Sequence, residues 1–156
     1  MNMIQSIAPA LLAGALALFA VPAAAGDPSV SAAKEREPAP AATRYKVILH
    51  VGDGEPAKWN VVLNNVANIQ KDLGAANVDV EVVAINAGLG MLKLDSVVGG
   101  RVAEAMKAGA NVVACENSMK AQKVTRDDML PGIGYVTAGV VELMQRQREG
   151  YAYIRP

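Results

Sequence analysis

Short apolar runs alternate with helical patterns along most of this chain, and that alternation constrains the fold more than any other feature. The apolar runs predict strands over residues 44–51, 78–85, 111–115, 133–136 and 151–154. Apolar residues spaced three and four apart predict helices between them, over 57–73, 96–108, 138–148 and, more weakly, 119–123. Strands joined through helices need crossovers, so the sequence predicts an α/β three-layer sandwich with a mainly parallel five-stranded sheet. We expect a flavodoxin-like strand order, in which the third strand lies beside the first.

The first 25 residues have the pattern of an export signal. Residues 7–21 are an apolar stretch interrupted only by Pro9, and small residues precede an expected cleavage after Ala25, although no Lys or Arg occurs in the first six residues. An uncleaved anchor is the alternative, but a membrane span needs about 20 apolar residues. We therefore expect a periplasmic protein in which residues 26–43, rich in Pro, Ala and Ser, form a flexible linker. Residues 44–156 are then long enough for one domain.

Charge and composition argue against several classes of function. The chain has 15 basic and 15 acidic residues, and its basic residues do not cluster beyond pairs, which argues against a nucleic-acid partner. A single histidine argues against a zinc site, and we expect neither a metal nor a cofactor. The segment 52–57 has the Gly-x-Gly-x-x-Ala form of a dinucleotide-binding turn. Asp53 and Glu55 would place negative charge where a pyrophosphate binds, so we interpret these glycines as turn formers.

Cys115 is the only cysteine, so it has no disulfide partner within a chain that is expected to reach an oxidising compartment. It ends the third predicted strand, at the sheet edge where parallel α/β folds gather their ligand chemistry. Backbone amides downstream, at Asn117 and Ser118, would lower the pKa of the thiol, whereas the Glu116 carboxylate would oppose a second negative charge. With the third strand beside the first, His50 would be a near neighbour, and an imidazolium there would favour the thiolate.

Structural interpretations of the same residues stay open. Free cysteines are among the most buried residue types, so Cys115 can be an inert core thiol. A single histidine near a strand end, such as His50, is commonly a hydrogen-bonded structural residue. With Met91 and Met119, these two residues would also form a soft ligand set for monovalent copper, although methionines beside apolar residues usually pack in the core.

Several segments within residues 46–156 carry a resemblance to a known family. They are the strand ending Val-Ile-Leu-His-Val, the helix at 58–68, the segment 82–88, Ala-Cys-Glu-Asn-Ser at 114–118, and the C-terminal stretch 136–156. Together they resemble the DsrE/DsrF-like family of small sulfur-relay proteins, in particular its exported branch. The resemblance implies a persulfide on Cys115 and trimers or hexamers whose cysteine loops lie near subunit contacts. Glu116 stands where a small residue is common in the family.

Three hypotheses for function follow. The first is a sulfur carrier or sulfurtransferase-like protein in which Cys115 holds the persulfide, Asn117 and Ser118 shape its anion-binding loop, and His50 tunes its protonation. Its partners would be a sulfur donor or acceptor protein or a small sulfur compound, in a homo-oligomer, with no membrane partner after signal removal. The second is a non-catalytic oligomeric module that binds a small ligand or soft metal and has a structural cysteine. The third is a redox sensor that forms an intermolecular disulfide through Cys115.

Overall fold

Five parallel strands form the central sheet of the computed structural model, which describes residues 44–156. The strands are β1 (Tyr45–Val51), β2 (Val78–Ala84), β3 (Asn111–Cys115), β4 (Gly134–Val136) and β5 (Ala152–Ile154). Every pairing between neighbouring strands is parallel, which confirms the predicted α/β fold and five-stranded sheet. The expected signal peptide (1–25) and linker (26–43) lie outside the described residues. Within 44–156, no helix combines the length and the apolar character of a membrane span.

The order of the strands differs from the expected flavodoxin-like order. Across the sheet the order is β4-β3-β2-β1-β5, so β2 separates β3 from β1. The first three connections step in one direction, and only the last returns past β1 to place β5 at the opposite edge. The apolar pattern sets the length and buried face of each strand, but it does not determine in which direction a crossover steps. The predicted contact between the ends of the first and third strands is therefore wrong.

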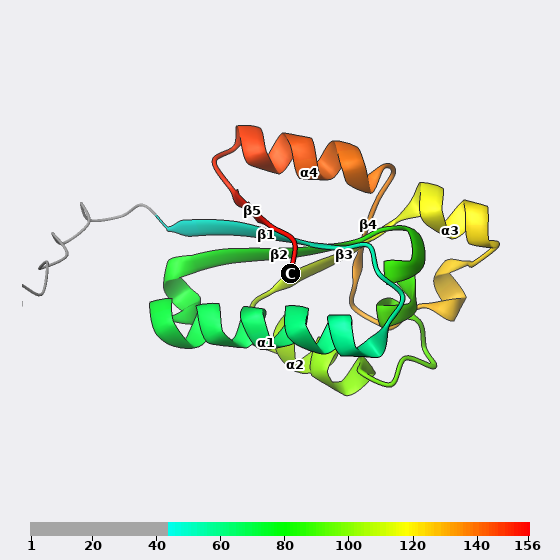
Figure 1. The fold of residues 1–156 in the computed structure, drawn as a ribbon, viewed down its shortest axis with the longest axis horizontal. Helices are drawn as coiled ribbons and strands as arrows, with labels where there is room; N and C mark the ends of the chain where they lie inside the picture. The colour runs from blue at the N-terminus through cyan, green and yellow to red at the C-terminus, as the bar shows by residue number, and fades with distance from the viewer. Residues whose placement is uncertain (1–43) are drawn as a thin grey trace, which may run out of the picture. The chain divides into compact units, whose positions relative to one another are not determined.

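Helices cover both faces of the sheet (Figure 1), which confirms the three layers. The helices α1 (Pro56–Leu73) and α2 (Gly99–Lys107) lie on one face, and α4 (Gly139–Arg148) lies on the other. The change of face follows from the change of direction, because right-handed crossovers that step in opposite directions place their helices on opposite faces. The short helix α3 (Glu116–Gln122) follows β3 at the carboxyl edge of the sheet.

Some elements differ from the prediction in kind or in extent. The expected loop after the second strand is a 3-10 helix, η2 (Asn86–Leu92), and α2 begins at Gly99 rather than near residue 96. The close packing of η2 against β1 explains a glycine in its sequence, since a Cβ on Gly88 would lie 2.2 Å from the carbonyl oxygen of Val51. The remaining short turns are the 3-10 helices η1 (Ala75–Asn77) and η3 (Arg126–Asp128).

The two faces of the sheet carry apolar cores of very different size. The face under α1 and α2 holds a large continuous cluster to which alternate residues of β1, β2 and β3 contribute. Under α4, the described residues form a much smaller apolar cluster with four buried members, Ile48, Val83, Val113 and Leu143. The sheet therefore gains most of its hydrophobic stabilisation on one side.

A buried ion pair helps to fix α4 to its face of the sheet. The Glu81 side chain in β2 is 2% exposed, and its Oε2 lies 3.0 Å from Nη2 of Arg146 in α4. The same oxygen accepts a hydrogen bond from the Asn111 side chain at 2.9 Å. Arg146 also pairs with Glu142 and Glu149 of its own segment, at 2.8 and 3.0 Å. Burial raises the pKa of Glu81 above its ordinary value, against the opposing effects of Asn111 and Arg146.

Candidate functional site

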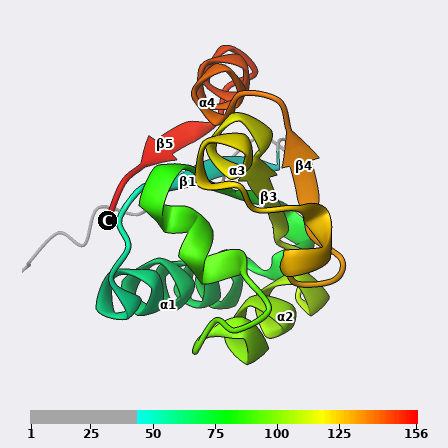
Figure 2. The ribbon, with the colours of Figure 1, turned by 90° about the vertical axis from the view of Figure 1, so that its right-hand side faces the viewer.

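Cys115 lies where β3 ends and α3 begins, on the face of the sheet that α4 covers. Its Sγ accepts a hydrogen bond from the backbone N–H of Gly139, the first residue of α4, at 3.2 Å. The N–H of Asn117 in α3 donates to the carbonyl of Thr137 at 3.1 Å, which ties the start of α3 to the segment before α4. Figure 2 views this edge and shows α3 next to α4. The thiol therefore lies between the beginnings of two helices.

Glycine at position 139 makes this approach of α4 to the sulfur sterically feasible. A Cβ added there would lie 2.3 Å from Cγ2 of Ile85 and 3.2 Å from the Cβ of Cys115. The first distance is far below any real carbon–carbon contact, so a larger residue would push the start of α4 away from the sheet. The backbone amide of Gly139 would then lose its contact with the sulfur.

The surroundings of Cys115 lower the pKa of its thiol. Burial raises this pKa, but the Ser118 hydroxyl and the backbone amides of Gly139, Ser118 and Asn117 lower it, and the net shift is downward. The Ser118 hydroxyl is itself held in place, because its oxygen accepts the backbone N–H of Asn86 at 2.9 Å. Amides at helix starts carry partial positive charge, which favours the thiolate over the neutral thiol. The amides of Asn117 and Ser118 thus lie close enough to the sulfur to affect its pKa.

Glu116 does not leave an uncompensated charge beside the thiol. Its carboxylate forms an ion pair with Arg126 in η3. The Arg126 guanidinium also lies over the ring of Tyr135, 4.3 Å from the centroid. The negative charge that the sequence places next to Cys115 is thus partly neutralised by a cation from a later segment, which reduces its opposition to the thiolate.

A pocket of about 350 Å³ opens onto the thiol. It is lined by Ile85, Asn86, Cys115, Asn117, Ser118 and Val140. Its wall is mostly apolar, and its polar side chains are those of Asn86, Asn117 and Ser118. Cys115 is only 5% exposed, so a reagent reaches it through this pocket rather than from an open surface.

His50 is not a neighbour of Cys115. It lies in β1, level with Val83 in β2 and Val113 in β3. Strands β1 and β3 are therefore two strand spacings apart, about 10 Å in all. Its Nδ1 lies 2.8 Å from the hydroxyl of Tyr153 in β5. Burial and the nearby cation of Arg155 lower the pKa of His50, so the neutral imidazole predominates at neutral pH. The sequence-based expectation of an imidazolium beside the thiol depended on the wrong strand order.

The four residues of the soft copper set are not brought together. Met91 and Met119 pack in the large core on the α1 and α2 face, whereas Cys115 and His50 lie on the other face and on different strands. Within residues 44–156, no three His, Cys, Asp or Glu side chains group in a way that could hold a metal ion.

Sequence reasoning misses two contributors to the site, Gly139 and Arg126. Gly139 acts through its backbone amide, and the contact joins positions 24 residues apart. A weak signal was available, because glycine in the first turn of a helix is unfavourable and often marks a close approach. Arg126 offers no such signal, since only the packing of η3 brings it to Glu116.

Comparison with known families agrees with the fold. The family model described as DsrE/DsrF-like matches residues 46–156. The chain belongs to the DsrE/DsrF-like family. Members of this family are generally connected with sulfur relay. No curated protein matches the sequence.

Solved structures of other proteins show the same fold. Protein MTH1491 of unknown function from Methanobacterium thermoautotrophicum is 37% identical, with a TM-score of 0.69 over 72% of this chain and 99% of its own. The ychN protein from E. coli is 13% identical, with a TM-score of 0.58 over 73% and 100%. Protein BT1422 of unknown function from Bacteroides thetaiotaomicron is also 13% identical, with a TM-score of 0.57 over 71% and 94%. The last two likenesses concern the fold alone.

Proposed function

We propose that the protein is a sulfur carrier that holds sulfane sulfur as a persulfide on Cys115. The observation that carries the proposal is the hydrogen bond from the Gly139 amide to Sγ, made at the start of α4. With the Ser118 hydroxyl and the amides of Asn117 and Ser118, it lowers the pKa of the thiol. The thiolate is the nucleophilic form of cysteine, so this environment favours attack on a sulfur donor.

The proposed loading step is a thiolate–persulfide exchange. The Cys115 thiolate attacks the outer sulfur of a donor persulfide, and a new bond forms between Sγ and that sulfur. The sulfur–sulfur bond of the donor breaks, and the donor leaves as a thiolate that takes up a proton from water. No electrons are gained or lost overall, and delivery to an acceptor is the same step in reverse. The 350 Å³ pocket has room for the added sulfur and part of a donor.

Mass spectrometry of the intact protein tests this proposal. After treatment with inorganic polysulfide, we expect a mass increase of one sulfur atom that a reductant removes and that Cys115→Ser abolishes. The serine variant is a close control because it replaces only the sulfur atom. A protein that gains no sulfur, or gains it equally without the cysteine, is not a carrier through this residue.

The burial of Cys115 favours a second candidate, a ligand-binding module with a structural cysteine. At 5% exposure, the thiol is as covered as many core cysteines. Alkylation of the folded protein separates the two functions. A carrier reacts with a small reagent such as iodoacetamide at a rate that rises with thiolate formation, whereas a structural thiol reacts only after unfolding.

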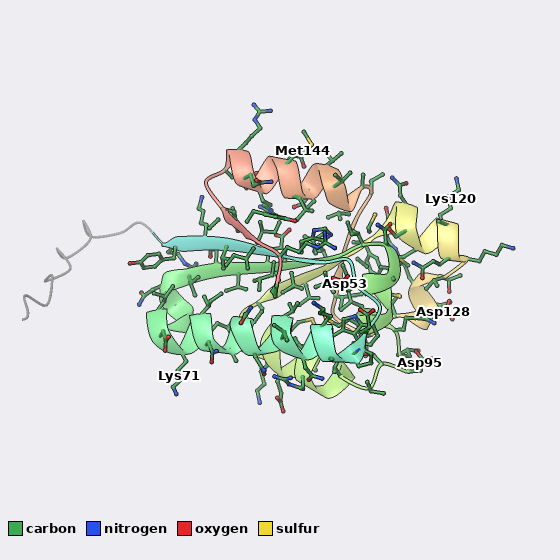
Figure 3. All side chains as sticks on the ribbon, in the orientation of Figure 1. Asp53, Lys71, Asp95, Lys120, Asp128 and Met144 are labelled. Atoms are coloured by element: carbon green, nitrogen blue, oxygen red, sulfur yellow. The ribbon has the colours of Figure 1, made fainter. Side chains whose placement is uncertain are left out.

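The proposal also includes a location and an assembly. Residues 1–25 would direct export, and a mature protein that begins at Gly26 on N-terminal sequencing would support this. Exposed apolar residues of α4, namely Val140, Val141 and Met144, support self-association, which we propose is a trimer or hexamer (Figure 3, in which Met144 points away from the sheet). A monomer at all concentrations in sedimentation equilibrium would contradict the assembly.

A further inference from the structure

A strip of residues crosses the carboxyl ends of four strands, from Cys115 to the C-terminus. Ile85 lies beside Cys115, since a Cβ on Gly139 would contact both side chains. The N–H of Ile85 donates to the carbonyl of Val51 at 2.9 Å, so the chain after β2 runs directly beside the end of β1. The strip therefore continues without interruption from the thiol pocket to Gly52.

The imidazole of His50 and the guanidinium of Arg155 both lie next to Gly52. A Cβ there would lie 3.2 Å from Nε2 of His50 and 3.8 Å from Nη2 of Arg155. Within the described part of the chain, Nε2 is buried and has no hydrogen-bond partner. If the Tyr153 hydroxyl donates to Nδ1, Nε2 carries the hydrogen and presents a donor toward the Arg155 guanidinium.

The Arg155 guanidinium is available to a ligand. Its side chain is 54% exposed, and the nearest carboxylate oxygen, Oδ2 of Asp53, lies 3.7 Å away, beyond hydrogen-bond distance. Arginine binds carboxylates through paired N–H donors, which a loose contact of this length does not use. The positive charge also acts on its surroundings, because Arg155 lowers the pKa of His50, secondary to burial and against the opposing effect of Asp53.

We infer that the sulfur donor is the persulfide of a small thiol compound whose carboxylate binds the Arg155 guanidinium beside Gly52, at the end of β1, two strand spacings or about 10 Å from the strand that carries Cys115. This inference rests on the proposed carrier function and names the class of its substrate. The donor's sulfur enters the pocket of Cys115 while its carboxylate lies over the ends of β1 and β5. Loading follows the exchange already described, with the carboxylate serving only to position the donor.

Binding is tested apart from sulfur transfer. In untagged Cys115→Ser protein, His50 is the single histidine, so one set of imidazole NMR signals reports on the site. Glutathione, which carries carboxylates several bonds from its sulfur, should shift these signals, and glutathione diethyl ester should not. Arg155→Gln should weaken binding about tenfold, the loss of one hydrogen-bonded charge. Asp53→Asn should strengthen it, because the competing carboxylate is gone.

Lys46→Gln is the matched control for charge. Lys46 lies on β1 and on the same face as His50, but toward the amino end, where its Nζ donates to the carbonyl of Glu149 at 3.1 Å. Its removal should leave the affinity unchanged. Equal shifts with the acid and the ester, or an Arg155→Gln protein of unchanged affinity, would overturn the carboxylate site.

Sulfur transfer then separates this inference from the carrier function. At low concentration, the persulfide of glutathione should load Cys115 about tenfold faster than that of the diethyl ester, and Arg155→Gln should remove the difference. If the two donors load Cys115 at equal rates, the protein is still a sulfur carrier, but the carboxylate site at Arg155 is overturned. If no donor, polysulfide included, loads Cys115, the carrier function fails, while the NMR titration still decides whether Arg155 binds carboxylates.

Discussion

Ile48 and Leu49 are neighbours in β1, both fully buried, and they face opposite sides of the sheet. Leu49 joins the large core under α1 and α2, whereas Ile48 joins the small cluster under α4. The face with the small cluster also carries the buried Glu81–Arg146 ion pair and the thiol. Strand alternation thus lets one sheet place its main apolar core and its reactive group on opposite sides.

The difference between the faces determines what kind of interaction holds the site. A large core positions its helices through many weak, non-directional contacts. On the α4 side few such contacts are present, so hydrogen bonds and ion pairs fix the helix, and these depend on direction and protonation. A single polar or steric substitution should therefore shift α4 relative to the sheet, whereas a comparable substitution should not shift α1 or α2.

The largest expected effect is on stability, from truncation of the large core. Leu49→Ala should lower the free energy of unfolding by about 3 to 4 kcal/mol, from lost burial and an unfilled cavity. Urea denaturation measures the change. The pKa of the Cys115 thiol, followed by the pH dependence of alkylation, should stay the same. Ile48→Ala is the matched variant on the other face and should raise that pKa, because Ile48 shares a cluster with Leu143 of α4, the helix whose first amide donates to the sulfur.

The second effect concerns the ion pair that holds α4. Arg146→Met should cost about 2 to 3 kcal/mol, less than the loss of one partner from a fully buried pair, because Arg146 is partly exposed. The Glu81 carboxylate then has no cation, and burial already raises its pKa in the folded state. A carboxyl whose pKa is raised in the fold stabilises the folded state only while it is protonated. The loss of unfolding free energy in Arg146→Met should therefore grow as pH rises from the pKa of glutamate in the unfolded chain to that of folded Glu81.

Glu81→Gln on the Arg146→Met background is the control for this pair. The neutral amide removes the buried charge, so the double variant should recover part of the lost stability and lose the extra pH dependence. A single Arg146→Met variant as stable as the original protein at neutral pH would show that apolar contacts alone fix α4.

Residue patterns predict the strands well because burial acts on each strand separately. The alternation in β2 and the apolar run of β3 each report which side chains are covered, and β3 has the predicted bounds. Strand order depends instead on the direction of each crossover, which no single segment encodes. His50 shows the consequence. The sequence predicts the strand in which it lies, but it does not predict that β2 separates this strand from the strand of Cys115.

The candidate site divides in the same way. The location of Cys115, Asn117 and Ser118 at the carboxyl end of β3 can be predicted from the sequence, because they lie close together at a strand end, where local rules apply. The Gly139 amide and the Arg126 cation come from segments that only the tertiary fold brings to the thiol. Backbone donors are especially hard to predict, since every residue carries one and the sequence does not distinguish the donor in use.

A third, smaller effect on stability isolates the contact between α4 and the thiol. Gly139→Ala should cost about 1 to 2 kcal/mol through overpacking against Ile85. The pKa of Cys115 should rise, because the amide moves away from the sulfur, and persulfide loading at neutral pH should slow. Gly100→Ala in α2 is the control, since a Cβ there meets nothing within 4 Å and should leave the thiol unchanged. An unchanged thiol pKa in Gly139→Ala would remove the main support for the site.

The smallest effect should come from His50 and concerns acid stability alone. Its pKa is lowered in the fold, by burial first and then by Arg155, with Asp53 acting in the opposite direction. The unfolded chain therefore binds the proton more readily, with a pKa of about 6.5. Stability from the neutral imidazole is present above that value and is lost as pH falls through it toward the pKa of the folded state.

In His50→Gln protein this component of the pH dependence should be absent, and the difference between the two unfolding curves against pH measures it. The thiol pKa should be the same in both proteins, because β2 lies between His50 and Cys115 and no contact joins them among residues 44–156. A lower thiol reactivity in His50→Gln would restore the imidazole as a tuning group, acting across the sheet edge. It would also mean that the α4 face behaves as one electrostatic unit from β3 to β5 rather than as two separate polar clusters.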